Sequence, residues 1–296
     1  MTEQELQQRR REKWRLDGQP ARTLEDARAF IESVGFCLMY PLPAAEAKGL
    51  RLIVPTFVGA YVGDAEKLPT RQHAFRDLRA QEATELMVRL LRDRSAYEAP
   101  LFGETTLLVA ATVFSYFYAL VGDRTTKHDR SDRNLSPLAH DLLDAVRREG
   151  PVSKPRLREV LGGEPSSAAL DRALSELWSR LRITRVDYNP REGAFWDLLH
   201  RWSPEAVNEG MHLSTAEALS ALVSKYLDCV VAADPKEVED FFSSVVPRSK
   251  VKESVNALLA SREVSFVNVG HRALLQVTPA RTATRPRESR RIKRIG

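Results

Sequence analysis

The stretch GPVSKPRLREVLGG (150–163) reads as one short helix between two sets of helix breakers. Gly150 and Pro151 end the segment before it, Ser153 is a residue type that caps helix N-termini, and Gly162 and Gly163 close it. A short helix with these boundaries is typical of the second helix of a helix-turn-helix motif. The stretch therefore predicts one more helix on each side.

An internal repeat supports this hypothesis. Adding 81 to the residue number superposes residues 138–186 on 219–267 without a gap. Apolar residues meet apolar residues in these pairs: Leu138 and Leu219, Leu142 and Val223, Val146 and Leu227, Leu157 and Val238, Leu161 and Phe242, Leu170 and Val251, Leu174 and Val255, Leu177 and Leu258, Trp178 and Leu259, Ile183 and Val264, Val186 and Val267. Chance is a poor explanation, because period, caps and element order agree.

Each copy predicts three helices followed by a β-hairpin. The first helix carries apolar residues at i, i+4 and i+8, and the second opens at Ser153 or Asp234. The third helix covers 167–181 or 249–261, and two short alternating segments follow it around a turn at 189–193 or 270–271. This is the element order of a winged helix. The predicted fold class is mainly α with small β-hairpins (α+β), carrying tandem winged-helix, or helix-turn-helix, domains.

The repeat divides the chain into four parts. We expect a mainly helical domain over 1–133, with a further winged-helix-like unit left open there, and winged helices over 134–205 and 206–280. Residues 203–213 are expected to be a linker, and Ser214 with Glu217 forms a capping box pattern. The tail 281–296 holds seven cations and one acid, so disorder is expected there. Further predictions are helices at 2–16, from 24 onward and over 74–93, a strand at 50–54 and a polar linker at 128–134.

Composition narrows the class of protein. The formal net charge of +5 permits nucleic-acid binding without demanding it, and Cys37 and Cys229 form no C-x-x-C pair. No catalytic or metal-binding motif with histidines and no phosphate-binding loop occurs, so no cofactor and no metal are expected. The most apolar segment, 105–121, is expected to be a buried core helix rather than a membrane span.

We expect a cytoplasmic, bacterial-type, nucleoid-associated protein without membrane contact. A monomer fits the sequence, which leaves the oligomeric state open.

A winged helix binds duplex DNA through its third helix and its wing. In the first copy, two carboxylates on the third helix weaken the prediction of DNA contact. In the second copy, cations at the start of the third helix favour contact with phosphate. The candidate DNA-binding residues are Lys154, Arg156, Arg172, Ser175, Ser179, Arg191, Arg248, Lys250, Lys252, Asn256, Arg272, Arg290 and Arg291. Cations on helices are also typical of a plain solvated face, and many tandem winged helices bind proteins instead.

The order of these segments resembles a known family. The stretches TLEDARAFIESVGF (23–36), GPVSKPRLREVLG (150–162), LDRALSELWSRLRITRV (170–186) and AFWDLLHRWSPE (194–205) are similar to the winged-helix proteins of the AlkZ/YcaQ DNA glycosylase family. The resemblance covers most of residues 23–279. It implies several winged helices around a DNA duplex and excision of alkylated or crosslinked bases.

This sequence departs from the family at its catalytic motif. The family has a Gln, an apolar residue, then Gln or Asp, just after the opening helix; these side chains hold the attacking water and stabilise the positive sugar. Leu38 and Tyr40 occupy those positions here, and residues 24–71 contain no Gln at all. Glu32 and Glu46 are the nearby carboxylates. The resemblance therefore implies that no catalytic residue of the standard pair is present.

The sequence leaves three functions open. The first is a DNA-binding relative of the crosslink and alkylbase glycosylases without the standard catalytic pair. The second is an active, monofunctional DNA glycosylase that uses other residues. The third is a winged-helix scaffold that binds proteins and no nucleic acid. Salt-dependent binding to duplex DNA separates the third from the first two, and base release separates the first from the second.

Overall fold

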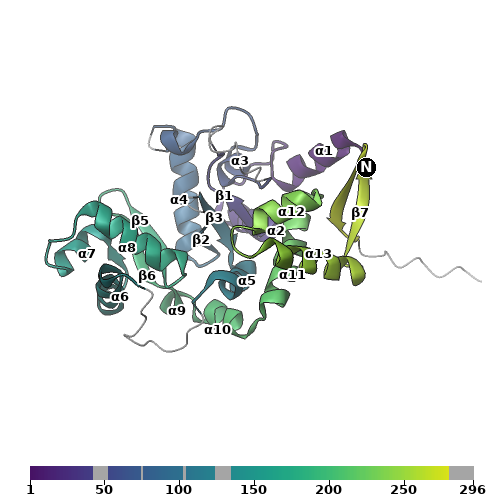
Figure 1. The fold of residues 1–296 in the computed structure, drawn as a ribbon. Helices are drawn as coiled ribbons and strands as arrows, with labels where there is room; N and C mark the ends of the chain where they lie inside the picture. The colour runs from purple at the N-terminus through teal and green to yellow at the C-terminus, as the bar shows by residue number, and fades with distance from the viewer. Residues whose placement is uncertain (43–52, 75, 103–104, 124–134, 280–296) are drawn as a thin grey trace, which may run out of the picture.

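Three units, each of three helices and a β-hairpin, follow one another along the chain. The structure is a computed structural model that describes residues 1–42, 53–74, 76–102, 105–123 and 135–279. The prediction of a mainly α fold with small β-hairpins is confirmed. The first unit lies in the middle, with the second on one side of it and the third on the other (Figure 1).

The second unit contains the stretch at 150–163. Its elements are α6 (Pro137–Glu149), β4 (Val152–Ser153), α7 (Lys154–Val160), α8 (Ser167–Ser179), β5 (Ile183–Asn189) and β6 (Gly193–Leu198). Gly150 ends α6 with a φ of 81°, a left-handed conformation that favours glycine. Ser153 stands at the N-cap position of α7, but its hydroxyl makes no cap bond and donates to Glu192 in the hairpin at 2.8 Å. The serine therefore ties α7 to the hairpin.

The third unit repeats this order. It contains α11 (Thr215–Val230), α12 (Pro235–Phe242), α13 (Arg248–Ala260), β7 (Val264–Val269) and β8 (Arg272–Val277). The capping box of Ser214 and Glu217 is present at the start of α11, and Asp234 with Glu237 forms another at the start of α12. The three helices and the hairpin predicted from each copy of the repeat are therefore confirmed.

The hairpins explain where the gapless offset ends. From Ile183 to its partner Leu198 the second unit needs two more residues than the third unit needs from Val264 to Val277. One is the extra residue of a bulge between Arg185 and Asp187, and the other lengthens the turn.

The first unit has the same topology without the sequence repeat. It contains α2 (Leu24–Val34), β1 (Phe36–Leu38), α3 (Phe57–Val62), α4 (Leu78–Arg92), β2 (Ala96–Phe102) and β3 (Thr105–Ala110). The strand after the opening helix pairs with the second hairpin strand, giving the order β1-β3-β2. The second unit has the matching order β4-β6-β5, and an isolated bridge from Ala233 to Leu275 on β8 replaces the third strand in the third unit.

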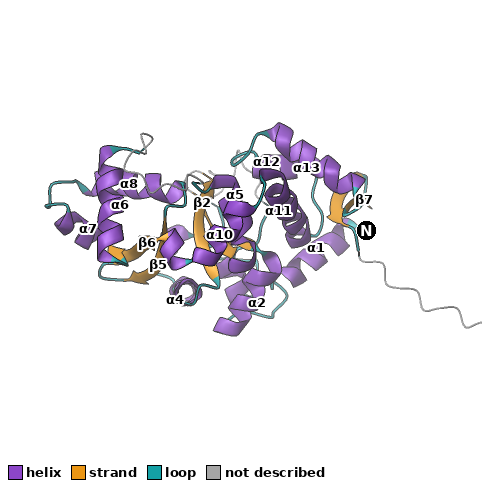
Figure 2. Cartoon of the chain, turned by 90° about the horizontal axis from the view of Figure 1, so that it is seen from below, coloured by secondary structure: helices purple, strands orange, loops and turns teal. Residues whose placement is uncertain are grey.

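The first and third units share one hydrophobic core, whereas the second has its own. Phe36 on β1 stacks on Tyr226 of α11 and on Phe241 of α12, with ring centroids 6.4 and 5.4 Å away. In the second unit Trp178 meets Trp196 edge to face at 5.3 Å. Figure 2 shows the resulting row, with α6, α7 and α8 at one end and α11, α12 and α13 at the other.

Helix α1 (Glu3–Lys13) joins the N-terminus to the third unit. It lies beside the hairpin that begins with β7 (Figure 1), and Leu6 packs into a small apolar cluster with Val269 and Leu274. Arg10 is buried and donates to the carbonyls of Val230 at 2.8 Å and Ala232 at 2.7 Å. The guanidinium therefore binds two carbonyls at the point where the chain leaves α11.

Polar contacts connect the first unit to the second. Arg92 on α4 pairs with Asp187 on β5 at 2.7 Å. Arg185 on β5 pairs with Glu98 on β2 at 3.3 Å, and its guanidinium lies over the Trp178 ring, 4.1 Å from the centroid. These contacts place the α4 side of the first unit against the hairpin of the second.

The expectations for residues 105–121 and 203–213 are wrong. Residues 105–121 form β3 followed by α5 (Ala111–Val121) rather than one helix, because a short continuous apolar run between two partner strands also fits a buried strand. Residues 203–213 form α10 (Pro204–His212) rather than a linker, after the short α9 (Leu199–Trp202). A Cβ at Gly210 would lie 2.7 Å from the Ser115 carbonyl oxygen, so glycine permits α10 to pack closely on α5.

The other predicted elements of the first 133 residues mostly hold. Helices are present at α1, α2 and α4, although α4 begins at Leu78 because Asp77 caps it, and a short 3-10 helix covers Arg71–His73. Of the strand expected at 50–54, residues 53 and 54 are in no strand, and 50–52 lie outside the described residues, as do the linker at 128–134 and the tail at 281–296. In the described ranges, no helix is long and apolar enough to span a membrane.

The Arg10 contact predicts a large effect of one substitution. Replacing Arg10 by Met removes both of its hydrogen bonds and leaves the Val230 carbonyl with only the Ala232 N–H, so the free energy of unfolding should fall by about 2–4 kcal/mol. Urea denaturation measures this change. Arg9→Met, an exposed neighbour on the same helix, is the matched control and should change stability by less than about 0.5 kcal/mol. Equal effects of the two variants would contradict the role of Arg10.

Candidate functional site

Leu38, which the sequence comparison places at the first position of the family motif, lies in the core of the first unit. Leu38 is the last residue of β1, is 4% exposed and pairs with Leu107 on β3. Its N–H donates to the Pro55 carbonyl at 3.0 Å. An apolar side chain enclosed in this way is almost fully shielded from solvent and offers no group that could hold a water.

Tyr40 points to the third helix of the first unit. Its hydroxyl lies 2.9 Å from the Thr84 hydroxyl and 3.5 Å from the Ala80 carbonyl, both on α4. Burial raises the pKa of the Tyr40 phenol, although the Thr84 hydrogen bond acts in the opposite direction. The phenol therefore stays protonated at neutral pH and cannot serve as a base. Of the two nearby carboxylates, Glu32 is exposed on α2, and Glu46 lies outside the described residues.

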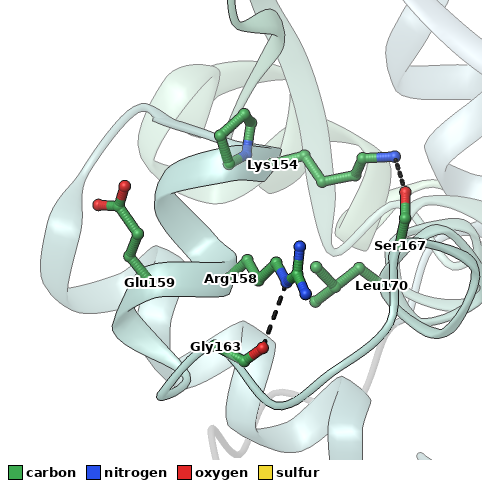
Figure 3. Close-up of a pocket in the computed structure, with 7 residues that line it drawn as sticks. Lys154, Arg158, Glu159, Gly163, Ser167 and Leu170 are labelled. Atoms are coloured by element: carbon green, nitrogen blue, oxygen red, sulfur yellow. Dashed lines mark hydrogen bonds between the residues drawn. The ribbon is translucent and has the colours of Figure 1, made fainter.

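The second unit has a pocket between its second and third helices. It measures about 580 Å³, and Figure 3 shows its residues: Lys154, Pro155, Arg158, Glu159, Gly163, Ser167 and Leu170. Lys154 donates to Ser167 at 2.9 Å and to Asp171 at 2.8 Å, and Arg158 donates to the Gly163 carbonyl at 3.3 Å. The lining carries both signs of charge, so the pocket by itself is no strong anion site.

The remaining candidates of the second unit divide into paired and unpaired side chains. Arg156 pairs with Glu149 and Glu159, and both contacts raise the pKa of its guanidinium. Arg172 and Ser175 are exposed on α8, and Ser179 donates to the Glu176 carbonyl one turn earlier. Arg191 is exposed in the hairpin turn. Within the described residues, Arg172 and Arg191 form no ion pair.

Every candidate cation of the third unit in the described ranges forms an ion pair. Arg248 pairs with Asp240 at 2.7 Å, Lys250 with Glu253 at 2.7 Å, and Lys252 with Glu239 at 3.6 Å. Arg272 in the hairpin pairs with Glu3 of α1 at 2.6 Å. Asn256 is exposed on α13, whereas Arg290 and Arg291 lie outside the described residues.

These ion pairs are what the sequence reading missed. The acid three residues after Lys250 was visible in the sequence as a possible helical pair. The pairing of Arg272 with Glu3 spans almost the whole chain, so no local pattern indicates it. Most of these groups are well exposed, and exposed pairs contribute only about 0–1 kcal/mol, so a phosphate can replace the carboxylate at little cost. Contact of these side chains with DNA stays a prediction.

The His, Cys, Asp and Glu side chains are scattered over the described ranges. No group of three or more His, Cys, Asp or Glu side chains there is arranged to hold a metal ion. Cys37 and Cys229 are buried and free, and burial raises the pKa of both thiols, so neither is poised as a nucleophile.

A family comparison gives this geometry its context. A sequence model described as "DNA glycosylase AlkZ-like" matches residues 73–295. The chain belongs to the AlkZ-like DNA glycosylase family. This confirms the resemblance drawn from the sequence. The matched residues begin after Leu38 and Tyr40, so the AlkZ-like assignment rests on α4 and the two units that follow it.

A solved structure of a DNA glycosylase shares the fold. The Streptomyces sahachiroi DNA glycosylase AlkZ is similar to this chain with a TM-score of 0.54 and 14% sequence identity. The similarity covers 92% of this chain and 70% of that one. A comparison with curated proteins finds no match. At this identity, the likeness shows a common AlkZ-like fold.

The burial of Leu38 predicts the cost of restoring the family's amide. Leu38→Gln places a polar group in the shared core without a partner, so the free energy of unfolding should fall by about 2–4 kcal/mol. Tyr40→Phe, the matched change at the other motif position, removes only the hydroxyl and should cost about 1 kcal/mol. Urea denaturation measures both. A Leu38→Gln variant as stable as the unaltered chain would mean that this side chain can leave the core.

Proposed function

We propose that this protein binds duplex DNA and does not cleave the glycosidic bond by the chemistry of its family. The burial of Leu38 carries the second half of the proposal. Where the family has a polar side chain that holds water, this chain has an apolar one, 4% exposed, in the core. The neighbouring Tyr40 keeps its proton and bonds to Thr84. Neither side chain can activate water or carry negative charge opposite the sugar.

The loss of catalytic rate expected from Leu38 and Tyr40 is too large for other residues to restore easily. Removing one positioned electrostatic partner typically slows an enzyme about a hundred- to thousandfold. Losing two partners leaves little of the family's mechanism, although such losses are rarely additive. Glu32, exposed on α2, is the nearest described carboxylate in sequence. It is the residue to test if activity is found.

DNA binding rests on the three units and their charge. We interpret each unit as a winged helix, with α4, α8 and α13 as the helices that approach the duplex. Exposed cations occur on or near these helices, and Arg172 and Arg191 need break no ion pair in the described ranges before meeting a phosphate. The chain also has a formal net charge of +5. Binding of this kind would associate the protein with the nucleoid, and it needs no partner subunit.

A base-release assay tests the catalytic half of the proposal. The full chain is incubated in excess with a duplex carrying N7-alkylguanine, and abasic sites are counted after mild alkali. We expect no release above the protein-free reaction, while the same sample shifts the duplex on a native gel. Base release abolished by Glu32→Gln would instead identify an active glycosylase with a replacement group.

The unpaired cations predict which charge changes weaken binding. Arg172→Gln should weaken binding to undamaged duplex and make the log–log salt slope shallower by about one unit, because one phosphate contact is lost. Fluorescence anisotropy across a range of salt concentrations measures both. Arg9→Gln removes the same charge from α1 and should leave the slope unchanged. Absence of any salt-dependent binding by the unaltered chain would favour a protein-binding scaffold.

A further inference from the structure

One exposed apolar side chain stands at the start of α4. Leu78 is the first residue of this helix, directly after its N-cap Asp77, and is 66% exposed. Among the described residues, Leu78 and Phe266 are the large apolar side chains exposed to this degree. Single exposed leucines are common on protein surfaces, so the position of Leu78 has to decide whether it has a role.

The position of Leu78 connects it to the family motif. Helix α4 is the third helix of the first unit, the element that enters the groove in a winged helix. The Tyr40 hydroxyl lies 3.5 Å from the Ala80 carbonyl, two residues after Leu78. The exposed leucine therefore lies two residues along α4 from a backbone carbonyl that Tyr40, one of the two residues at the motif positions, approaches.

The charges around Leu78 indicate what it meets. Arg71 and Arg76 precede α4, are exposed, and form no ion pair within the described part of the chain. Arg79 pairs with Asp77 at 2.7 Å and so is largely neutralised. An apolar tip that follows two unpaired arginines in the chain within seven residues is complementary to a base step between phosphates. A purely apolar protein partner would not use these cations.

We propose that Leu78 inserts into the base stack of duplex DNA at a weakened base pair, while Arg71 and Arg76 hold the flanking phosphates. The inference rests on the proposed DNA binding and adds a substrate class, duplexes with a mismatched or damaged pair. Apolar wedges at protein–DNA interfaces unstack base steps, and a pair that is already weakened costs less to open. Insertion therefore makes the protein select damaged DNA without reading its sequence.

The test compares matched and mismatched duplexes that carry 2-aminopurine beside the test pair. The full chain should bind the mismatched duplex roughly tenfold more tightly, as expected for burial of one leucine side chain, and raise the 2-aminopurine fluorescence. Leu78→Ala should lose this preference and the fluorescence rise, yet bind the matched duplex within about twofold of the unaltered chain. Leu78→Gln, which keeps the length of the side chain, should behave in the same way.

Three control variants separate insertion from general binding. Phe266→Ala truncates the other exposed apolar side chain and should retain both the preference and the fluorescence rise. Arg71→Gln and Arg76→Gln should weaken binding to both duplexes and make the salt slope shallower, by about one unit each. A thermal melt of each variant checks that the fold is intact.

Several results would overturn the insertion. Equal affinity for the two duplexes, with salt-dependent binding to both, would reject insertion and leave the proposed DNA binding standing. No binding to either duplex would reject both. Self-association that Leu78→Ala abolishes, with no change in affinity for either duplex, would assign the leucine to a protein contact instead.

Discussion

The stacking of Phe36 against Tyr226 and Phe241 is the contact on which the rest of the structure depends. It fuses the first and third units into one core, although they stand at opposite ends of the sequence. Because Phe36 lies two residues before Leu38 on β1, the same contact keeps Leu38 inside the protein. Exposing that strand would expose buried aromatic rings. The chain therefore combines an AlkZ-like fold with a buried strand at Leu38.

The cations on the surface are mostly held in ion pairs. Most cations that the sequence offers for DNA contact are paired with nearby carboxylates, such as Arg248 with Asp240 and Arg272 with Glu3. Exposed pairs are weak, so a phosphate group can displace the carboxylate at little cost. The pairs would therefore lower the affinity for DNA without preventing binding. Arg172, Arg71 and Arg76 have no such competitor in the described ranges. With Arg191 in the second hairpin turn, they are the cations on which the proposed DNA contact rests.

Much of the fold was predictable from local pattern. The repeat, the caps at Ser214 and Asp234 and the apolar periods predicted both later units, because such signals arise within about twenty residues. The strand at 105–110 was missed because a buried strand between two partners shows no alternation. The departure at Leu38 was visible in the sequence, but its burial in a core shared with α11 and α12 was not, because that core joins segments far apart in the sequence. The ion pair of Arg272 with Glu3 could not be predicted for the same reason.

Hydrogen exchange at β1 tests the central claim most directly. The Leu38 amide donates to the Pro55 carbonyl, and Cys37 pairs with Leu108 in the sheet. If β1 is a fixed core strand, both amides should exchange only through global unfolding, with the same protection in the free protein and in a complex with alkylated duplex. Exchange within seconds, or loss of protection on binding DNA, would show that this strand opens toward the substrate and would contradict the account.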